Sequence, residues 1–456
     1  MRRAQAMAAL VVAAVLLGGA AYADRELGPR PPDEANATTA ASGVWYCPHG
    51  GGESDWEVFL QIANPGDAEA RIRVRSFGPR RPEAAEEMTI EPRSSVRVPV
   101  PADARAGGST VEWFGRWVAV GWLSHAGGGE GGVASEPCAD AAGTRWLLPD
   151  GTSETGDNDD YVIVMNPFAQ PAVVSMVLLS EREEPVRHGE LTNVEIRPFR
   201  SRAVRLSDFV LGERTVATLV EVSVGRVVAG TLGVNAAGGI RSTIGYVEVP
   251  PQDATFPGAA DAGRTDLVVM NVADERVGVG AELLQRDADV PFPGVEDSVP
   301  PATSGRTVPA TTEGATSITV SAESAEVAAA RRTFGRVSDQ GATAGASPAP
   351  AWVILPAVAG TPSHPAIAVA NPGPEPAEIT FTRLATGEEA TLTVAPRRTR
   401  TVPKEFLEAD PEAVVIAIAT SGTFVPASAS YSLGREGFAT YAVALGIPIP
   451  ERWMPG

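Results

Sequence analysis

The chain has 456 residues and a formal net charge of −19 at pH 7. This excess of acidic residues favours solubility and argues against a nucleic acid as the main partner, because the sequence offers no basic face for a polyanion. The 47 glycines and 39 prolines are dispersed without a collagen period, which indicates many turns between short strands.

The first 23 residues have the features of an export signal. Two arginines precede a largely apolar run that ends in Ala21-Tyr22-Ala23, a small-x-small cleavage pattern. We predict a secretory signal, with an uncleaved membrane anchor as the alternative, although the run is short for a membrane span. The protein is therefore predicted to be exported, either extracellular or in the cell envelope, and to meet the membrane only through this segment. Residues 24–44 are predicted to form a flexible stalk.

One short segment recurs four times, about every hundred residues, the length of a β-sandwich domain. Each copy ends in an asparagine: Asn64, Asn166, Asn271 or Asn371. Positions four and two before the asparagine are apolar in every copy, and so are positions six, eight and ten after it. This period of two predicts two strands, each with one buried face, joined at the asparagine.

The residues at this junction have turn chemistry. Proline follows the asparagine in three copies, as Pro65, Pro167 and Pro372, whereas the third copy has Val272 and has lost the proline. A second shared segment, in which a proline precedes a valine by several residues, lies further along each copy. A late apolar run then closes each copy, at residues 117–123, 226–232, 327–330 and 423–429.

These patterns predict an all-β chain, a tandem array of four immunoglobulin-like β-sandwich repeats. The predicted repeats cover residues 45–140, 141–250, 251–345 and 346–450. The third is predicted to be degenerate, with a low-complexity insertion at 287–316, and residues 338–350 are predicted to be a linker. One closed, propeller-like assembly of the same strands is the alternative.

The two cysteines bracket the first repeat. Cys47 opens it and Cys138 closes it, and the sequence has no other cysteine. In an exported chain this arrangement predicts a disulfide between the first and last strands of the repeat. The competing interpretation, a metal site built on two thiols, would need further ligands that the sequence does not offer.

Aromatic residues recur near the start of each repeat, with a proline soon after. Trp45, Trp146 and Trp352 occupy this place in three repeats, and the third offers Phe256. We predict that these rings pack in the core at the domain junctions. A platform for stacking glycans is the alternative.

Several residues could in principle carry chemistry. Ser124 and His125 are adjacent, which suggests a hydrolase, but the matching hairpin of the second repeat has neither residue and no nucleophile-elbow motif surrounds Ser124. The acidic run 150–160, with Glu154, Asp157, Asp159 and Asp160, could offer oxygen ligands to calcium. It lacks the spacing of a calcium loop, so a solvated loop is predicted. Gly127-Gly128-Gly129 lacks the Lys-Ser/Thr of a phosphate-binding loop.

Arginines recur around the second shared segment of each repeat. We predict that they form the solvated face of a strand, and a row of anion-binding sites is the alternative. The arginines are Arg93, Arg97, Arg200, Arg202, Arg306, Arg397, Arg398 and Arg400.

The combination of an N-terminal signal, Trp residues with a nearby proline, Asn-Pro turns and the Cys47/Cys138 pair resembles a domain-of-unknown-function family of secreted or membrane-anchored actinobacterial proteins. The stretch Asn64 to Ala68, followed by Ile72 and Val74, is similar to bacterial immunoglobulin-like sandwiches. Neither resemblance implies catalytic residues, a cofactor or a metal.

The sequence therefore predicts a non-enzymatic, exported cell-envelope protein with a binding or scaffolding role. Its partner would be an envelope protein or a wall polymer. A carbohydrate-active hydrolase or glycan-binding protein of the cell wall is the alternative, because carboxylates are abundant enough to supply an acid and a base.

Overall fold

The computed structural model describes residues 42–454, except for 53–54, 81–83, 103, 128–130, 155–157, 183, 236–238, 259–263, 287–288, 292–297, 308–315, 335–339, 358–362 and 434–438. The predicted signal, residues 1–23, lies outside the described residues, as does most of the predicted stalk. The end of that stalk, residues 42–44, already belongs to strand β1 (Ser42–Cys47). Among the described residues, no helix is long and apolar enough to cross a membrane.

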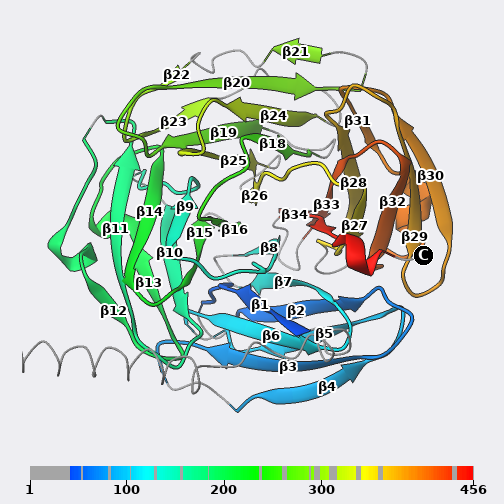
Figure 1. The fold of residues 1–456 in the computed structure, drawn as a ribbon, viewed down its shortest axis with the longest axis horizontal. Helices are drawn as coiled ribbons and strands as arrows, with labels where there is room; N and C mark the ends of the chain where they lie inside the picture. The colour runs from blue at the N-terminus through cyan, green and yellow to red at the C-terminus, as the bar shows by residue number, and fades with distance from the viewer. Residues whose placement is uncertain are drawn as a thin grey trace, which may run out of the picture. The chain divides into compact units, whose positions relative to one another are not determined.

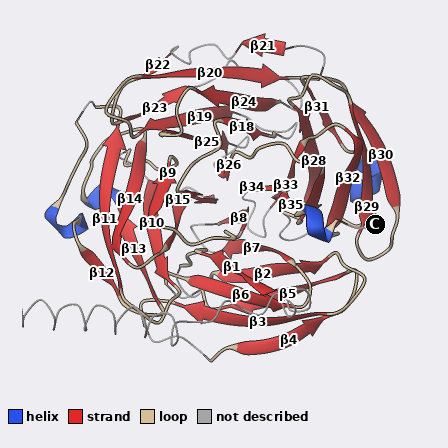
Figure 2. Cartoon of the chain, viewed as in Figure 1, coloured by secondary structure: helices blue, strands red, loops and turns tan. Residues whose placement is uncertain are grey.

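The prediction of an all-β chain is confirmed. The described strands form eight antiparallel sheets of four or five strands, two in each repeat (Figure 2). In each repeat one sheet contains the strand that ends in the repeated asparagine, and we call it the axial sheet. The other contains the strand at the start of the repeat, and we call it the lateral sheet.

The first two repeats have the following strands. The lateral sheet of repeat 1 has the order β1 (Ser42–Cys47), β6 (Gly108–Phe114), β3 (Ala70–Phe77) and β4 (Glu86–Ile90), and its axial sheet has the order β5 (Ser94–Val100), β2 (Glu57–Asn64), β7 (Ala119–Ala126) and β8 (Gly132–Pro137). The lateral sheet of repeat 2 has the order β12 (Val194–Ile196), β11 (Ala172–Ser180), β14 (Val216–Val224), β9 (Arg145–Leu148) and β17 (Tyr246–Val247), and its axial sheet has the order β13 (Arg200–Arg205), β10 (Asn158–Asn166), β15 (Val228–Asn235) and β16 (Ile240–Ile244).

The last two repeats follow the same plan. The lateral sheet of repeat 3 has the order β18 (Asp253–Phe256), β24 (Ser317–Ala322), β20 (Val277–Leu284) and β21 (Asp289–Pro291), with β22 (Ser298–Val299) also on β20, and its axial sheet has the order β23 (Thr303–Thr307), β19 (Arg264–Asn271), β25 (Val327–Phe334) and β26 (Gln340–Ala344). The lateral sheet of repeat 4 has the order β30 (Glu389–Val394), β29 (Ala377–Arg383), β32 (Val415–Ser421), β27 (Ala351–Ile354) and β35 (Ile447–Pro448), and its axial sheet has the order β31 (Arg398–Thr401), β28 (Ser363–Asn371), β33 (Val425–Leu433) and β34 (Ala439–Leu445).

Helical structure is confined to short segments between strands: η2 (Gly189–Leu191), η3 (Leu206–Asp208), α2 (Lys404–Glu408) and η4 (Glu451–Trp453). The degenerate repeat 3 has the same sheet order as the other three repeats. Its predicted insertion, residues 287–316, contains β21, β22 and β23, and the rest of that segment is largely outside the described residues.

The immunoglobulin-like part of the prediction is not confirmed, because the strand order differs. Two pairings are those of an immunoglobulin sandwich: the second strand of a repeat pairs with the fifth, and the third with the sixth. The first and seventh strands have exchanged sheets. In repeat 1 the first strand, β1, pairs with β6, and the seventh, β7, pairs with β2.

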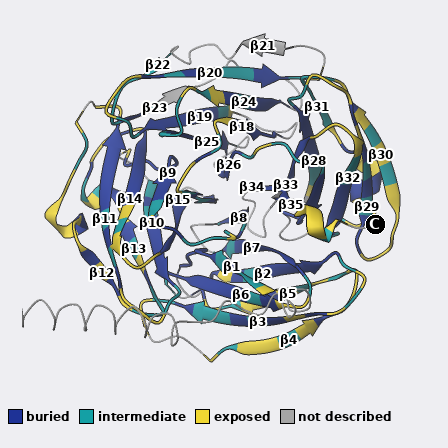
Figure 3. Ribbon diagram, in the orientation of Figure 1, coloured by how far each residue is buried: buried dark blue, intermediate teal, exposed yellow. Residues whose placement is uncertain are grey.

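The four repeats close on themselves instead of forming an open row (Figure 1). The lateral sheet of each repeat faces the axial sheet of the next, and repeat 4 meets repeat 1. At that closure Gln61 Nε2 donates to the Pro356 carbonyl at 3.0 Å, and Arg97 pairs with Glu412 at 3.1 Å. This is the closed assembly that the sequence left as the alternative. Closure buries the axial sheets on both faces, and strands such as β7 and β15 are almost wholly buried (Figure 3).

The last axial strand of each repeat reaches the centre of the assembly. Strands β8, β16, β26 and β34 lie near one another there, and a Cβ on Gly132 of β8 would lie within 2.7 Å of the Gly239 Cα that precedes β16 (Figure 1). Small residues are needed where four strands converge. The predicted linker at 338–350 is therefore wrong for residues 340–344, because its glycine and alanines form β26 and not a linker.

The recurring tryptophans lie in the cores, as predicted. Trp146 and Trp352 are fully buried, and Trp45 is 6% exposed, so the glycan-platform alternative is excluded for these rings. Strand register shows that the tryptophan position of repeat 3 is held by Ala254, because Trp45 pairs with Val111 as Ala254 pairs with Val320. Phe256 lies two residues later on the same face of β18 and is also buried, so it fills the core from a neighbouring position.

Each repeated asparagine makes the same set of hydrogen bonds. Asn64 Oδ1 accepts from the Gly66 N–H at 3.0 Å, which closes the turn between β2 and β3. Its Nδ2 donates to the carbonyls of Ala68, Ile90 and Glu91, the last two of which lie at the end of β4. The other three asparagines reproduce this network with their own carbonyls. All four side chains are at most 1% exposed.

The same loop places one residue of each repeat in the left-handed region. Arg93, Phe199, Ala302 and Arg397 have φ between 50° and 55°. An L residue in this region is uncommon and is held there by its surroundings. The Arg93 N–H donates to the Gly66 carbonyl, which ties this residue to the asparagine turn. The four residues therefore project from equivalent points, one at each junction between repeats.

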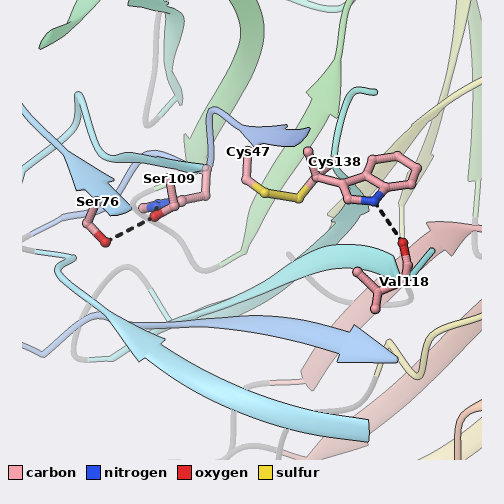
Figure 4. The surroundings of a disulfide bond; sticks show 7 residues. Cys47, Ser76, Ser109, Val118 and Cys138 are labelled. Atoms are coloured by element: carbon pink, nitrogen blue, oxygen red, sulfur yellow. Dashed lines mark hydrogen bonds between the residues drawn. A yellow bond between two sulfur atoms is a disulfide. The ribbon is translucent and has the colours of Figure 1, made fainter. Parts of the chain in front are cut away.

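The predicted disulfide is confirmed. Cys47, at the end of β1, is bonded to Cys138, just after β8, with their Cα atoms 4.7 Å apart (Figure 4). The bond joins the lateral sheet of repeat 1 to the end of its axial sheet. It is flanked by buried polar groups, since Trp45 Nε1 donates to the Val118 carbonyl at 2.7 Å.

We expect Asn271→Ala to lower the free energy of unfolding by about 2–4 kcal/mol, because it leaves one N–H and three carbonyls without their partner. Pro372→Ala is the control and should cost less than about 1 kcal/mol, since repeat 3 keeps the network without a proline. Chemical denaturation of the purified chain measures both values. Similar small losses in the two variants would contradict a structural role for the amide.

Removing the disulfide by Cys47→Ala/Cys138→Ala should cost about 2–5 kcal/mol. Because repeat 1 contacts both repeat 2 and repeat 4, we expect the whole of residues 42–456 to lose stability together, and not the first repeat alone. Thermal unfolding with and without a reducing agent tests this, and the double variant should not respond to the reductant. Separate unfolding of repeat 1 would show that closure does not couple the repeats.

Candidate functional site

A pocket of about 660 Å³ lies between repeats 3 and 4. Its floor is the lateral sheet of repeat 3, formed by β18, β20 and β24. Its wall comes from the loops of repeat 4. The polar and charged lining residues are Asp253, Thr255, Glu282, Thr319, Ser321, Arg397 and Thr423, and the small or apolar ones include Gly280, Pro348, Pro372 and Gly373.

Because the repeats share one strand register, every position in this pocket has a counterpart at the other junctions. The junction between repeats 1 and 2 is filled by a stack of side chains. Tyr46 of β1 packs on Phe168, with ring centroids 6.3 Å apart. The guanidinium of Arg226 lies over the ring of Phe168, 5.1 Å from its centroid.

The pocket is open because all three members of this stack are small at the junction between repeats 3 and 4. Tyr46 corresponds to Thr255, since Tyr46 forms an isolated β-bridge with Ala139 and Thr255 forms the equivalent bridge with Ala346. Phe168 and Gly373 are each two residues after the asparagine, and both donate their N–H to its Oδ1 at 3.0 Å. Arg226 corresponds to Thr423, the residue after a positive-φ glycine in each case.

At a second pair of positions the two junctions differ in the chemistry of their side chains and not mainly in side-chain size. In the filled junction Arg75 lies 5.2 Å from the ring centroid of Phe199, the left-handed residue of repeat 2. In the pocket the counterparts are Glu282 and Arg397, which form an ion pair across the junction. Cation–π contact at one junction has therefore been replaced by a charge pair at the other.

The remaining two junctions have other residues at these positions. Between repeats 2 and 3, Arg145 pairs with Glu326, and these residues correspond to Asp253 and Thr423 of the pocket. Between repeats 4 and 1, counting back from the paired strand β7 places Trp117 at the position of Thr423, and the ring of Trp117 packs on Trp45 of its own repeat, with centroids 6.2 Å apart. The pocket thus arises where this chain departs from its own repeat.

The acidic run 150–160 is organised by arginines and not by a metal. Asp150 and Asp160 are buried, and both accept hydrogen bonds from Arg241 of β16. Arg332 of β25, in the next repeat, also donates to Asp150. The prediction of a solvated loop is therefore wrong for these two aspartates. Their carboxylates are bound by guanidinium groups, which argues against the calcium alternative at these two residues.

This cluster extends to Gln340 of β26, whose Oε1 accepts from Arg241 Nη1 at 2.8 Å. Burial by itself would raise the pKa of Asp150, but the charges of Arg241 and Arg332 outweigh it and hold that pKa below the ordinary value. Burial raises the pKa of Asp160, which Arg241 offsets only in part. The remaining members of the run are different: Asp159 pairs with Arg205 near the surface, and Asp157 is outside the described residues.

A further buried carboxyl lies at the centre of the assembly. Glu136 of β8 is 1% exposed, and its Oε1 accepts from the Ile244 N–H at 3.3 Å. Its Oε2 has no hydrogen-bond partner among the described residues. Burial raises the pKa of Glu136 well above its ordinary value. No sequence motif distinguishes it.

Ser124 and His125 do not form a catalytic pair. They are neighbours on β7 and therefore point to opposite faces of the sheet. The structure instead pairs His49 with Ser109, whose Oγ lies 3.0 Å from His49 Nε2. The other ring nitrogen lies 2.6 Å from the Gly50 carbonyl. Both residues are fully buried, and burial lowers the pKa of His49 to about 4, which identifies them as packing residues.

The predicted solvated face accounts for only part of the repeated arginines. Three of them are exposed, namely Arg93, Arg97 and Arg202. Four are half-buried, namely Arg200, Arg397, Arg398 and Arg400, and the side chain of Arg306 is not among those that the structure describes. Among the glycines considered for a phosphate loop, Gly127 donates its N–H to the Asp55 carbonyl, and the two that follow lie outside the described residues. Within the described residues no group of three potential ligands could hold a metal ion.

Comparison with known families gives one match: residues 102–353, more than half of the chain, match the family of unknown function DUF5719. The chain belongs to this family. The predicted resemblance to a domain-of-unknown-function family is thereby confirmed at that level. The match includes the buried cluster of Asp150, Asp160, Arg241 and Arg332, whereas Gly373, Arg397 and Thr423 of the pocket lie beyond its end.

Two solved structures show limited similarity to this DUF5719 chain. One is the crystal structure of Thermotoga maritima 1070, with 26% identity and a TM-score of 0.21, covering 23% of this chain and 95% of that one. The other is a tetra-tandem repeat from the extending region of a large adhesion protein, with 11% identity and a TM-score of 0.08, covering 90% of this chain and 100% of that one. No curated protein matches.

We expect Arg332→Met to lower the free energy of unfolding by about 3–5 kcal/mol, because it leaves buried Asp150 with one guanidinium partner. Asp150 owes its lowered pKa partly to Arg332, so its stabilising effect is present above the ordinary Asp value of 3.8 and is lost as the pH falls below it. The difference in the free energy of unfolding between Arg332→Met and the wild type should therefore become smaller at acidic pH.

The matched control is Arg205→Met, which breaks the Arg205–Asp159 pair near the surface of the same region. It should cost less than about 1 kcal/mol. Denaturant titrations at pH 7 and at pH 3.5 measure both variants. Equal losses for Arg332→Met and Arg205→Met would show that the buried cluster is not a major stabilising element.

Proposed function

We propose that the chain is a non-enzymatic, exported protein of the cell envelope, with a binding or scaffolding role. The observation that carries this proposal is the open pocket at one of four equivalent junctions. At two of the other junctions the equivalent space is occupied, by Tyr46, Phe168 and Arg226 in one and by the Arg145–Glu326 pair in the other. A pocket of several hundred Å³ between packed domains is the usual form of a ligand site.

The rest of the fold supports a rigid scaffold. Closure of the four repeats buries both faces of the axial sheets, and the disulfide fixes the first repeat. A disulfide between buried cysteines is also consistent with an oxidising compartment outside the cytosol. In this proposal the N-terminal segment directs export and is the part that meets the membrane, and the partner is an envelope protein or wall polymer.

The hydrolase alternative receives less support from the pocket. It does hold two carboxylates, Asp253 and Glu282, but Glu282 is paired with Arg397. A carboxylate held by a guanidinium is a poor general acid, because the cation favours its charged form. The residues lining the pocket include no aromatic ring on which a sugar could stack.

Export and binding can be tested together. A C-terminal alkaline phosphatase fusion, which becomes active only after export, should be active with the full chain and inactive when residues 1–23 are deleted. The purified chain should be retained by isolated wall polymers or envelope proteins without releasing reducing ends from the polymers. An inactive fusion would contradict the compartment, and released reducing ends would favour the hydrolase.

A further inference from the structure

The pocket between repeats 3 and 4 can be compared with the filled junction between repeats 1 and 2. Both junctions use the same framework: a lateral sheet as floor, an asparagine turn and a left-handed residue as wall. What the pocket lacks relative to the junction between repeats 1 and 2 is one stack, formed by the rings of Tyr46 and Phe168 and the guanidinium of Arg226. The pocket therefore lacks the two rings and the cation that fill its counterpart.

The floor around this space has also lost its own large side chains. In repeat 1, Arg73 and Glu112 form an ion pair on the outer face of the lateral sheet. By register, their counterparts in repeat 3 are Gly280 and Ser321, both of which line the pocket. A Cβ on Gly280 would meet Ser321 Oγ at 2.9 Å, so the absence of a side chain at this point keeps the floor open.

The charged residues of the pocket indicate the sign of the charge on its ligand. Asp253 stands where repeat 1 has Val44, and Glu282 stands where it has Arg75. With Arg397, the lining carries two carboxylates and one guanidinium, within a chain of net charge −19. This balance favours a cation, and more strongly at low ionic strength.

We propose that the pocket between repeats 3 and 4 binds a peptide segment that presents an aromatic side chain next to a basic one. The ring would lie over the turn at Gly373, where Phe168 provides a ring in the filled junction. The cation would lie between this ring and the carboxylate of Asp253, on the side where Arg226 lies in the filled junction. The inference rests on the proposed function and names its ligand chemistry.

The direct test uses short peptides as probes for the purified full chain. N-acetyl-Tyr-Arg amide should bind saturably by calorimetry or by ligand-observed NMR. N-acetyl-Tyr-Glu amide, with the charge reversed, and N-acetyl-Ala-Arg amide, without the ring, should each bind at least about tenfold more weakly. Equal binding of all three peptides would overturn the proposal.

The variants rebuild the filled junction inside the pocket. Gly373→Phe/Thr423→Arg introduces the residues that the chain already uses as Phe168 and Arg226, and should abolish binding of the Tyr-Arg probe. The double variant should keep the thermal midpoint of the wild type, because the same turn accommodates phenylalanine at Phe168. Asp253→Asn should lower the affinity for the Tyr-Arg probe several-fold and should not lower the affinity for the Tyr-Glu peptide. Binding that persists in the double variant would overturn the proposed site.

Gly66→Phe is the matched control. Gly66 has the same asparagine turn as Gly373, and a Cβ at either position meets the asparagine Oδ1 at 3.2 Å. It lies at the junction between repeats 4 and 1, so it should leave probe binding unchanged. Loss of binding in Gly66→Phe would show that the turn, and not the pocket, is responsible.

Comparison with envelope binding separates the two proposals. If wall or envelope material is retained by the wild type and lost in Gly373→Phe/Thr423→Arg, but the Tyr-Arg probe does not bind, the proposed function holds and the ligand class is wrong. If the probe binds as expected while no envelope material is retained, the ligand chemistry holds and the proposed function is wrong.

Discussion

The fold depends on one buried amide that occurs four times. In each repeat the asparagine at the end of the second strand accepts one backbone N–H and donates to three carbonyls from two different loops. A buried amide with this many partners is expensive to disrupt, because each orphaned backbone group would lose its hydrogen bond away from water. The network fixes how the second and third strands turn, and it also fixes the loop that carries the left-handed residue. It therefore places the side chains that meet at every junction.

Once the loops are fixed, the repeats can stack only by covering each other's sheets. The central strands of the axial sheets are buried on both faces, because one face packs within its sandwich and the other against the preceding repeat. An open row would leave the axial face of repeat 1 and the lateral face of repeat 4 in water. Closing the assembly buries both, with Gln61 reaching the Pro356 carbonyl across the closure. The convergence of the last axial strands then demands the small residues seen in β8 and β26.

The departures from the repeat are more informative about function than the repeat itself. Four equivalent junctions present the same framework, and two of them are occupied by aromatic or ion-paired side chains at the positions that line the pocket. At the junction between repeats 3 and 4, threonine and glycine stand in those places and leave a pocket of about 660 Å³. Loss of contact at one junction reduces the packing that stabilises the closed assembly, since an unfilled volume forgoes dispersion contacts. The buried charges of Asp150, Arg241 and Arg332 lie at a different junction and hold repeats 2 and 3 together.

The all-β class, the repeat around Asn64, Asn166, Asn271 and Asn371, the Cys47–Cys138 disulfide and the burial of the tryptophans can be predicted from the sequence. These features follow from local signals, namely a period of two, turn residues and a bracketing cysteine pair. Features that depend on distant partners become evident only in the folded chain. The sequence predicts a solvated loop for Asp150, because its two arginine partners are 91 and 182 residues away. It predicts a linker where β26 lies, because glycine and alanine are as typical of a linker as of a strand at the crowded centre. The pocket became visible only after strand register aligned Gly373 with Phe168, because a missing side chain leaves no motif in a sequence.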